Sequence, residues 1–122
     1  SHRIELSVDA HPLNRDSELQ GQYPITWANS GLIDRIFDMR YQPSIDYDNI
    51  ARISVKLNAP DKLAILLSNI DRANGNWVPR PATLLRTQIM DIHSRWPNKW
   101  IGIYHRPRIT EEQLTMLHKV WR

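Results

Sequence analysis

The sequence contains no cysteine among its 122 residues. Without thiols the chain can form neither a disulfide framework nor a thiolate zinc site, and it has no cysteine nucleophile. Its four glycines do not form the pattern of a phosphate-binding or dinucleotide-binding loop. No apolar run approaches the about 20 residues that a membrane span requires, and the N-terminus lacks the hydrophobic segment of a signal peptide. We therefore expect no membrane partner and a reducing compartment, which is the cytoplasm or, in a eukaryote, the nucleus.

The size and composition are those of one globular domain. Hydrophobic residues make up 41% of the chain and charged residues 24%, which is ordinary for a folded protein. A chain of 122 residues can enclose one core but not two. It begins with Ser1 and His2 in place of methionine, as after removal of a purification tag, and it stops within an unfinished helix after Trp121. We expect residues 1–122 to form a single domain of a longer protein.

The spacing of apolar residues predicts a mixed α+β domain. Alternation typical of a strand with one exposed face occurs at 3–8 and 51–57, and β-forming residues fill 99–105. Residues 9–28 are polar, contain prolines and glycine, and are interpreted as a long connection. Apolar residues at helical spacing predict four helices, at about 30–40, 58–74, 81–96 and 110–121.

The predicted order is therefore β-α-β-α-α-β-α, and two arrangements fit it. One is a small α+β sandwich with the helices on one face of a three-stranded sheet. The other is a winged-helix-like variant, in which a helix-turn-helix is followed by a β wing. A long turn between the second and third helices and the lack of a clear second wing strand count against the variant. The two arrangements stay open at this level.

The net charge of +3 is distributed unevenly along the chain. Residues 1–60 hold 6 Lys and Arg against 8 Asp and Glu, a balance of −2, whereas residues 61–122 hold 10 against 5, a balance of +5. Arginine outnumbers lysine 12 to 4, which favours planar, two-pronged recognition of phosphate or of base edges. Because polyanions respond to local charge, the second half is the candidate nucleic-acid surface.

A nucleic-acid site is predicted on the helix at 81–96 and on the turn that follows the last strand. Small hydroxyl side chains and arginines share the helix face opposite the apolar stripe, an arrangement that suits an approach to DNA. The Arg-Pro-Arg turn at 106–108 would reach a neighbouring groove or backbone. An ordinary solvated surface carries similar residues and is the competing interpretation. The predicted nucleic-acid-binding residues are Arg80, Thr83, Arg86, Thr87, Arg95, Lys99, Arg106 and Arg108.

The aromatic residues support a second, weaker hypothesis. Trp96 and Trp121 fall on apolar helical stripes and are expected in the core. Trp77 lies in the predicted loop from Gly75 to Arg80, where no apolar pattern places its side chain in the core. An exposed Trp77 would anchor a protein interface or stack on a base. The leading prediction is a nucleic-acid-binding module, with DNA favoured over RNA. The alternative is a protein-interaction or assembly domain that uses Trp77 and the chain ends to bind a protein partner or another domain of the parent protein.

No catalytic centre, metal site or cofactor site is predicted. The histidines are too scattered for ligand spacing, and no H-E-x-x-H motif is present. Asp34 and Asp38 would lie one helical turn apart, but neighbouring arginines can pair with them. Asp46 and Asp48 are interpreted as turn and cap residues. The sequence therefore indicates a binding domain and not an enzyme, with an accessory domain of an enzyme as the remaining enzymatic option.

Overall fold

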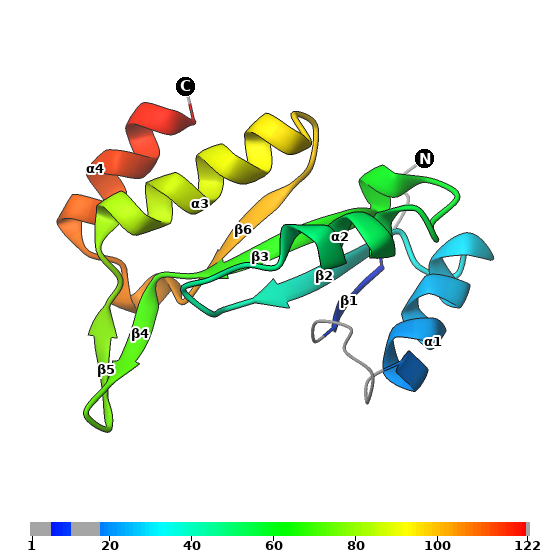
Figure 1. The fold of residues 1–122 in the computed structure, drawn as a ribbon, viewed down its shortest axis with the longest axis horizontal. Coiled ribbons are helices and arrows are strands. Elements are labelled where there is room, and N and C mark those ends of the chain that lie inside the picture. Colours follow the sequence, from blue (N-terminus) through cyan, green and yellow to red (C-terminus); the bar gives the residue numbers. More distant parts are fainter. Residues whose placement is uncertain (1–5, 11–17, 122) are drawn as a thin grey trace.

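The computed structural model describes residues 6–10 and 18–121, with the backbone alone for residues 18–23. Ser1 and His2, interpreted as a tag remnant, lie outside the described residues, as do residues 3–5 of the first predicted strand. Figure 1 shows the fold. The elements follow in the order β1 (Ser7–Ala10), α1 (Glu18–Asn29), β2 (Arg35–Arg40), α2 (Tyr47–Ser54), η2 (Pro60–Lys62), β3 (Leu63–Ser68), β4 (Ile70–Ala73), β5 (Asn76–Pro79), α3 (Ala82–Arg95), β6 (Ile101–Tyr104), η3 (Arg106–Arg108) and α4 (Glu111–Val120).

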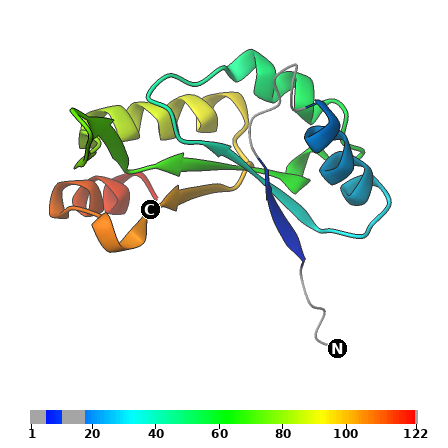
Figure 2. The same ribbon diagram turned by 90° about the horizontal axis from the view of Figure 1, so that it is seen from below.

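Among the described residues, four strands form a parallel sheet in the order β1-β2-β3-β6. Parallel neighbours cannot be joined by a tight turn, and each pair here is joined by a crossover that contains a helix: α1, α2 or α3. The sheet is strongly twisted, so that β1 runs steeply across the direction of β6 (Figure 2). All four strands point the same way, and their carboxyl ends therefore meet at one edge of the sheet.

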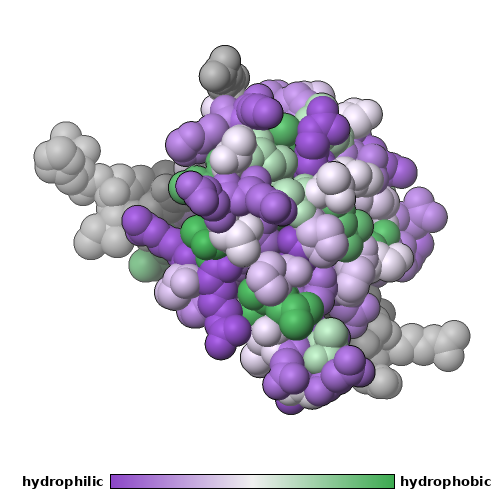
Figure 3. Space-filling model, turned by 90° about the vertical axis from the view of Figure 1, so that its left-hand side faces the viewer, coloured by the Kyte–Doolittle hydropathy of each residue, from purple (hydrophilic) through white to green (hydrophobic). Residues whose placement is uncertain are grey.

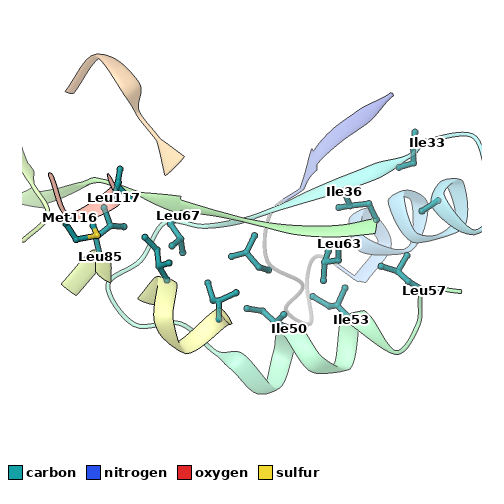
Figure 4. Packing of buried hydrophobic residues seen from close by; sticks show 14 residues of the cluster. Ile33, Ile36, Ile50, Ile53, Leu57, Leu63, Leu67, Leu85, Met116 and Leu117 are labelled. Atoms are coloured by element: carbon teal, nitrogen blue, oxygen red, sulfur yellow. The ribbon is translucent and has the colours of Figure 1, made fainter. Parts of the chain in front are cut away.

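One face of the sheet carries the hydrophobic core. Ile36 of β2 and Leu63 and Leu67 of β3 are buried on this face, and they pack toward Ile50 of α2 and Leu85 of α3 (Figure 4). Buried residues of α1 and α4 belong to the same cluster. The continuous apolar run of β3 is typical of a central strand in a parallel sheet.

The opposite face of the sheet is only half covered. Phe37 and Met39 of β2 and Leu66 of β3 point away from the core face, because side chains alternate along a strand, and they remain half-buried. Gly102 of β6 lies on this face beside Leu66; a Cβ at Gly102 would stand 2.8 Å from Leu66 Cδ1. The side chain of Leu66 therefore occupies the space that the glycine leaves.

A buried ion pair interrupts the apolar core face on β2. The Arg40 guanidinium donates to both carboxylate oxygens of Asp38 at 2.9 Å and to Asn49 Oδ1 of α2 at 2.6 Å. Burial raises the pKa of Asp38 above its ordinary value, although Arg40 acts in the opposite direction. The pair joins β2 to the first turn of α2, where Asp46 caps the helix by accepting from the Asn49 N–H at 3.0 Å.

A β-hairpin leaves the sheet at the carboxyl end of β3. Its strands β4 and β5 pair antiparallel from Ile70–Pro79 to Ala73–Asn76. Asn74 and Gly75 form the turn with φ values of 50° and 79°, the backbone combination that two-residue hairpins require and that Asn-Gly supplies. The hairpin projects away from the sheet beside the start of α3 (Figure 1).

The predicted class, a small domain of mixed helices and strands, is confirmed. The predicted helix at 81–96 corresponds to α3, the strand at 99–105 contains β6, and the last helix is α4. Thr110 and Gln113 form a capping box at the start of α4, each side chain bonding the other residue's backbone. These elements were predictable because proline and capping residues mark their ends.

Three predicted elements between residues 30 and 74 are wrong. The helix at 30–40 contains the strand β2, the strand at 51–57 begins inside the helix α2, and the helix at 58–74 contains β3 and the first hairpin strand, β4. The connection at 9–28 contains most of α1. The winged-helix alternative is not confirmed, since the main strands run parallel with helical crossovers.

Candidate ligand-binding pocket

A pocket of about 510 Å³ lies at the carboxyl edge of the parallel sheet. Residues at or just after the ends of three strands form part of its wall: Tyr41 after β2, Ser68 of β3 and Tyr104 of β6. In open parallel sheets, ligands bind outside the carboxyl ends of the strands, because the loops there converge on one another. The remaining wall comes from the hairpin and from the turns that follow β2 and β6, through Gln42, Pro43, Ile70, Asp71, Arg72, Trp77, His105 and Arg108.

Four aromatic rings line the pocket, those of Tyr41, Trp77, Tyr104 and His105. The rings of Tyr41 and Tyr104 are stacked, with centroids 5.3 Å apart and planes inclined by 21°. The His105 ring lies 4.7 Å from the Tyr104 ring. Burial raises the pKa of Tyr41, and the nearby Asp9 carboxylate acts in the same direction. Together with Trp77 of the hairpin, these rings offer flat surfaces of the kind that bind planar or ring-shaped ligands.

The pocket also has a positive rim. Arg72 of β4 and Arg108 of η3 line it and are exposed. The Arg72 guanidinium lies 5.0 Å from the centre of the Trp77 ring, so the hairpin presents a cation and an aromatic face together. Arg108 belongs to the Arg-Pro-Arg turn after β6. Figure 3 shows the side of the molecule with the hairpin and α4, on which polar side chains dominate and hydrophobic residues form small, separate groups.

One carboxylate lines the pocket, that of Asp71, and a buried arginine balances its charge. Asp71 accepts from Arg80, whose Nη2 lies 2.7 Å from Asp71 Oδ1. Arg80 is fully buried; it also donates to Gln88 Oε1 at 2.8 Å and to the Tyr41 carbonyl at 2.6 Å. Because the charge of Asp71 is balanced by Arg80, the remaining charged side chains among the lining residues are the cations Arg72 and Arg108.

A second buried side chain fixes the turn after β6. Gln113 of α4 donates through Nε2 to the carbonyls of Asn69 and Arg80, both at 2.8 Å, and its Oε1 accepts from Asn69 at 3.3 Å. Asn69 in turn accepts from the His105 N–H. Buried hydrogen bonds therefore link the ends of β3, the hairpin and β6 to α4. Because these polar groups have partners inside the protein, the hydrogen bonds hold the pocket wall in one geometry.

The structure corrects the predicted nucleic-acid site at two residues. Arg80 is fully buried in its ion pair with Asp71 and has no surface for a phosphate. Lys99 is folded onto the protein, with Nζ donating to the carbonyls of Leu63 at 3.0 Å and Pro60 at 3.4 Å, and its burial lowers its pKa. Both were selected for charge and position in the sequence, and neither property reveals an internal partner.

The other predicted residues do not form one surface. Thr83, Arg86 and Thr87 are exposed on the first half of α3, and Thr87 donates to the Thr83 carbonyl at 3.0 Å. Arg95 lies at the far end of this 14-residue helix, with its guanidinium 4.2 Å from the centre of the Tyr47 ring. The predicted residues are therefore divided between the two ends of the strands. The helix α3 begins near the carboxyl ends of the strands and finishes near their amino ends. Arg106 and Arg108 lie at the carboxyl edge with the pocket.

Two predicted residues, Trp77 and Arg108, are brought together by the pocket. The sequence prediction missed Tyr41, Arg72, Tyr104 and His105. The Asn74–Gly75 pair was a signal for the hairpin that carries Arg72 and Trp77. No signal marked Tyr41, because its strand was interpreted as a helix. Trp121, expected in the core, is 50% exposed, whereas Trp96 packs against the core.

The part of the chain that the structure describes offers neither a metal site nor a membrane span. Within it, no group of three or more His, Asp or Glu side chains is arranged to hold a metal ion. None of its helices combines the length and apolar character needed to cross a membrane. No known protein family matches the chain, and no similar protein was found among curated sequences or solved structures.

Proposed function

We propose that this chain is a nucleic-acid-binding module that holds one nucleotide unit in the carboxyl-edge pocket. The observation that carries the proposal is the convergence of four aromatic rings and two exposed arginines on a single pocket at the carboxyl edge of a parallel sheet. A nucleotide has the matching chemistry, because it joins a planar base to a phosphate anion. The pocket volume falls within the range of about 300–1,000 Å³ typical of small-ligand sites.

The base would lie against the aromatic walls. Trp77 is 50% exposed and stands on a hairpin whose turn is well defined, so its ring is available for stacking. The stacked pair of Tyr41 and Tyr104 offers a second flat surface. Stacking of a base on an aromatic ring contributes about 1–3 kcal/mol and depends little on base identity. We therefore expect weak sequence preference.

In a strand, the two phosphates that flank this base would lie at Arg72 and Arg108, one at each arginine. Both arginines line the pocket, Arg72 from the hairpin and Arg108 from the turn after β6, and the neighbouring Asp71 carboxylate is occupied by Arg80. Charge-assisted contacts of this kind are the stronger class of hydrogen bonds to phosphate. A base inside an intact duplex cannot enter a pocket of this kind, so single strands or strand ends are the favoured form.

The proposal is tested by titrating the chain, with intrinsic tryptophan fluorescence and calorimetry, against a mononucleotide, a single-stranded oligonucleotide and a duplex. We expect the single strand to bind most tightly, the mononucleotide to compete for the same site, and the duplex to bind weakly. Trp77→Ala and Arg108→Gln should each weaken single-strand binding by about ten-fold, on the scale of one lost stack or one charged contact. Arg52→Gln on α2 is the matched control, since Arg52 is exposed and does not line the pocket.

Two outcomes would overturn the proposal. The first is the absence of single-strand binding at low salt. The second is binding that falls with Arg86→Gln on α3 but not with Arg108→Gln, which would return the site to the helix face. The alternative role of Trp77 as an interface anchor predicts a different result. The chain would bind a protein partner at high salt, Trp77→Ala would abolish this binding, and no nucleotide would bind.

A further inference from the structure

The strand β6 is the last strand of the parallel sheet, on the side away from β1 (Figure 2). The edge formed by this outer strand is distinct from the carboxyl edge at which the pocket lies. Every residue of β6 keeps partial exposure, whereas β3 beside it is almost entirely buried. The N–H of Ile65 donates to the Trp100 carbonyl at 2.9 Å, and the N–H of Asn69 donates to the Tyr104 carbonyl at 2.7 Å. Backbone groups alternate along a strand, so those of Ile101 and Ile103 point outward, away from β3.

The sequence of this edge is symmetric about Gly102. Reading outward in either direction gives first an isoleucine, Ile101 or Ile103, and then an aromatic residue, Trp100 or Tyr104. The two aromatic side chains lie on the open face of the sheet and are 57% and 45% exposed. No charged residue interrupts the segment. A segment with this symmetry presents the same groups to a second copy of itself when the two run antiparallel.

We propose that two copies of this chain associate through β6, paired antiparallel around a two-fold axis at Gly102. The outward backbone groups of Ile101 then exchange hydrogen bonds with those of the second copy's Ile103, as in a hydrogen-bonded antiparallel pair. Gly102 faces its own equivalent in a non-hydrogen-bonded pair, where Cα atoms approach to about 4.5 Å. Trp100 faces the second copy's Tyr104, and aromatic pairs at such positions stabilise a sheet.

The other edge of the sheet does not offer this pairing. β1 has the sequence Ser-Val-Asp-Ala, and its exposed Asp9 would meet a like charge near its equivalent in an antiparallel pair. Two cations lie beside β6, and both are engaged within the chain: the ammonium of Lys99 is bound to the carbonyls of Leu63 and Pro60, and the Arg35 guanidinium lies 3.9 Å from the centre of the Trp100 ring. The edge at β6 is therefore both apolar and free of like-charge repulsion.

The pairing would also bring a residue of the second copy to the pocket. Tyr104 lines the pocket, and the second copy's Trp100 would lie next to it on the same face of the continuous sheet. The inference does not rest on the proposed ligand, since it follows from the edge strand alone. A contact limited to one strand pair is smaller than the about 1,200 Å² of a standard interface, so we expect a weak dimer.

Sedimentation velocity of the full chain over a range of concentrations, without ligand, tests the association. We expect a monomer–dimer equilibrium. Trp100→Lys combined with Tyr104→Lys places like charges opposite each other and should weaken the dimer by about ten-fold or more, whereas Trp100→Glu combined with Tyr104→Lys places opposite charges there and should restore most of the loss. Trp77→Lys on the hairpin is the control and should leave the dimer unchanged.

A cysteine tests the register directly, because the chain has none of its own. Gly102→Cys, made with Leu66→Ala to free the space beside it, should form a disulfide-linked dimer on mild oxidation, since the expected Cα distance lies within the about 4.4–6.8 Å that a disulfide spans. Thr115→Cys, exposed on α4, should not do so at the same concentration. A strictly monomeric chain, a dimer that weakens with Trp77→Lys but not with the paired lysines, or equal cross-linking of the two cysteine variants would overturn the proposal.

Discussion

Arg80 and Asp71 form an ion pair beneath the pocket, with Arg80 Nη2 2.7 Å from Asp71 Oδ1 and the Arg80 side chain fully enclosed by protein. The same guanidinium also donates to Gln88 and to the Tyr41 carbonyl. One buried cation thus connects the hairpin, α3 and the turn after β2. The pocket walls on these three elements depend on it, so its removal is the sharpest test of how the site is held.

Arg80→Met should lower the free energy of unfolding by about 3–5 kcal/mol, because it leaves Asp71, Gln88 and a buried carbonyl without their partner. Denaturant unfolding followed by circular dichroism measures the change. Arg86→Met, at an exposed position of α3, is the matched control and should change stability by less than about 0.5 kcal/mol. Similar values for the two variants would show that the internal ion pair does not exist.

Gln113→Glu should destabilise the chain at neutral pH with almost no change in shape. The carboxylate cannot donate to the carbonyls of Asn69 and Arg80, and it places a charge beside two oxygen atoms, at a cost of about 2–4 kcal/mol. The folded-state pKa of the new carboxyl is raised, so the lost stability should return in part as pH falls and the proton restores one donor. Unfolding curves at acidic and neutral pH measure this, with Gln42→Glu at an exposed position as the control. A pH-independent loss would contradict the assigned donors.

The tyrosine with the highest pKa should be Tyr47. Burial, followed by the carboxylate of Asp91, raises its pKa from 10.0 to about 12, and its hydroxyl donates to Asp91 Oδ2 at 3.3 Å. Absorbance titration of the four tyrosines should show one late phase that disappears in Tyr47→Phe and moves to lower pH in Asp91→Asn. A wild-type titration without a late phase would contradict this environment.

The same shift has a consequence for stability. Because the folded-state pKa of Tyr47 lies above the unfolded value of 10.0, the unfolded chain ionises first, and this side chain makes folding less favourable as pH rises from 10 toward 12. The lowered pKa of Lys99 acts in the opposite direction. Comparison of wild type with Tyr47→Phe cancels the lysine contribution, and we expect the variant to lose less stability over this range.

Salt dependence should report two phosphate contacts. If Arg72 and Arg108 each meet one phosphate, log affinity for a single strand should fall with log salt with a slope of about −1.4, and Arg108→Gln should reduce the slope to about −0.7. A slope near −4 would require several further basic residues. It would favour the broad helix-face site over the pocket.

The fold from α3 onward was predictable because its signals are local. Pro81 precedes α3, and Thr110 with Gln113 caps α4. The elements between residues 30 and 74 were not predictable, because tertiary contacts there override the apolar pattern. β2 buries Asp38 and Arg40 on its core face, so its hydrophobic alternation is lost, and β3 is apolar on both faces, which periodicity cannot distinguish from a buried helix.

Only two of the residues that line the pocket were predicted from the sequence, Trp77 and Arg108. Trp77 stood out as an aromatic residue in a loop and Arg108 as part of a basic turn. Tyr41 and Tyr104 meet only because β2 and β6 end at the same edge of a parallel sheet, which requires the strand order. Arg80 was wrongly predicted to be a surface residue: its charge suggested exposure, whereas its hydrogen-bond partners all lie within the chain.

The most direct test of the account is a two-dimensional NMR titration of the isotope-labelled chain with a mononucleotide. We expect shifts at Tyr41, Trp77, Tyr104 and His105, with the indole N–H of Trp77 moving more than those of the other four tryptophans. Signals of Arg86 and Thr87 on α3 should stay in place. Shifts confined to α3, or no shifts at saturating nucleotide, would contradict the central claim that the carboxyl-edge pocket is the binding site.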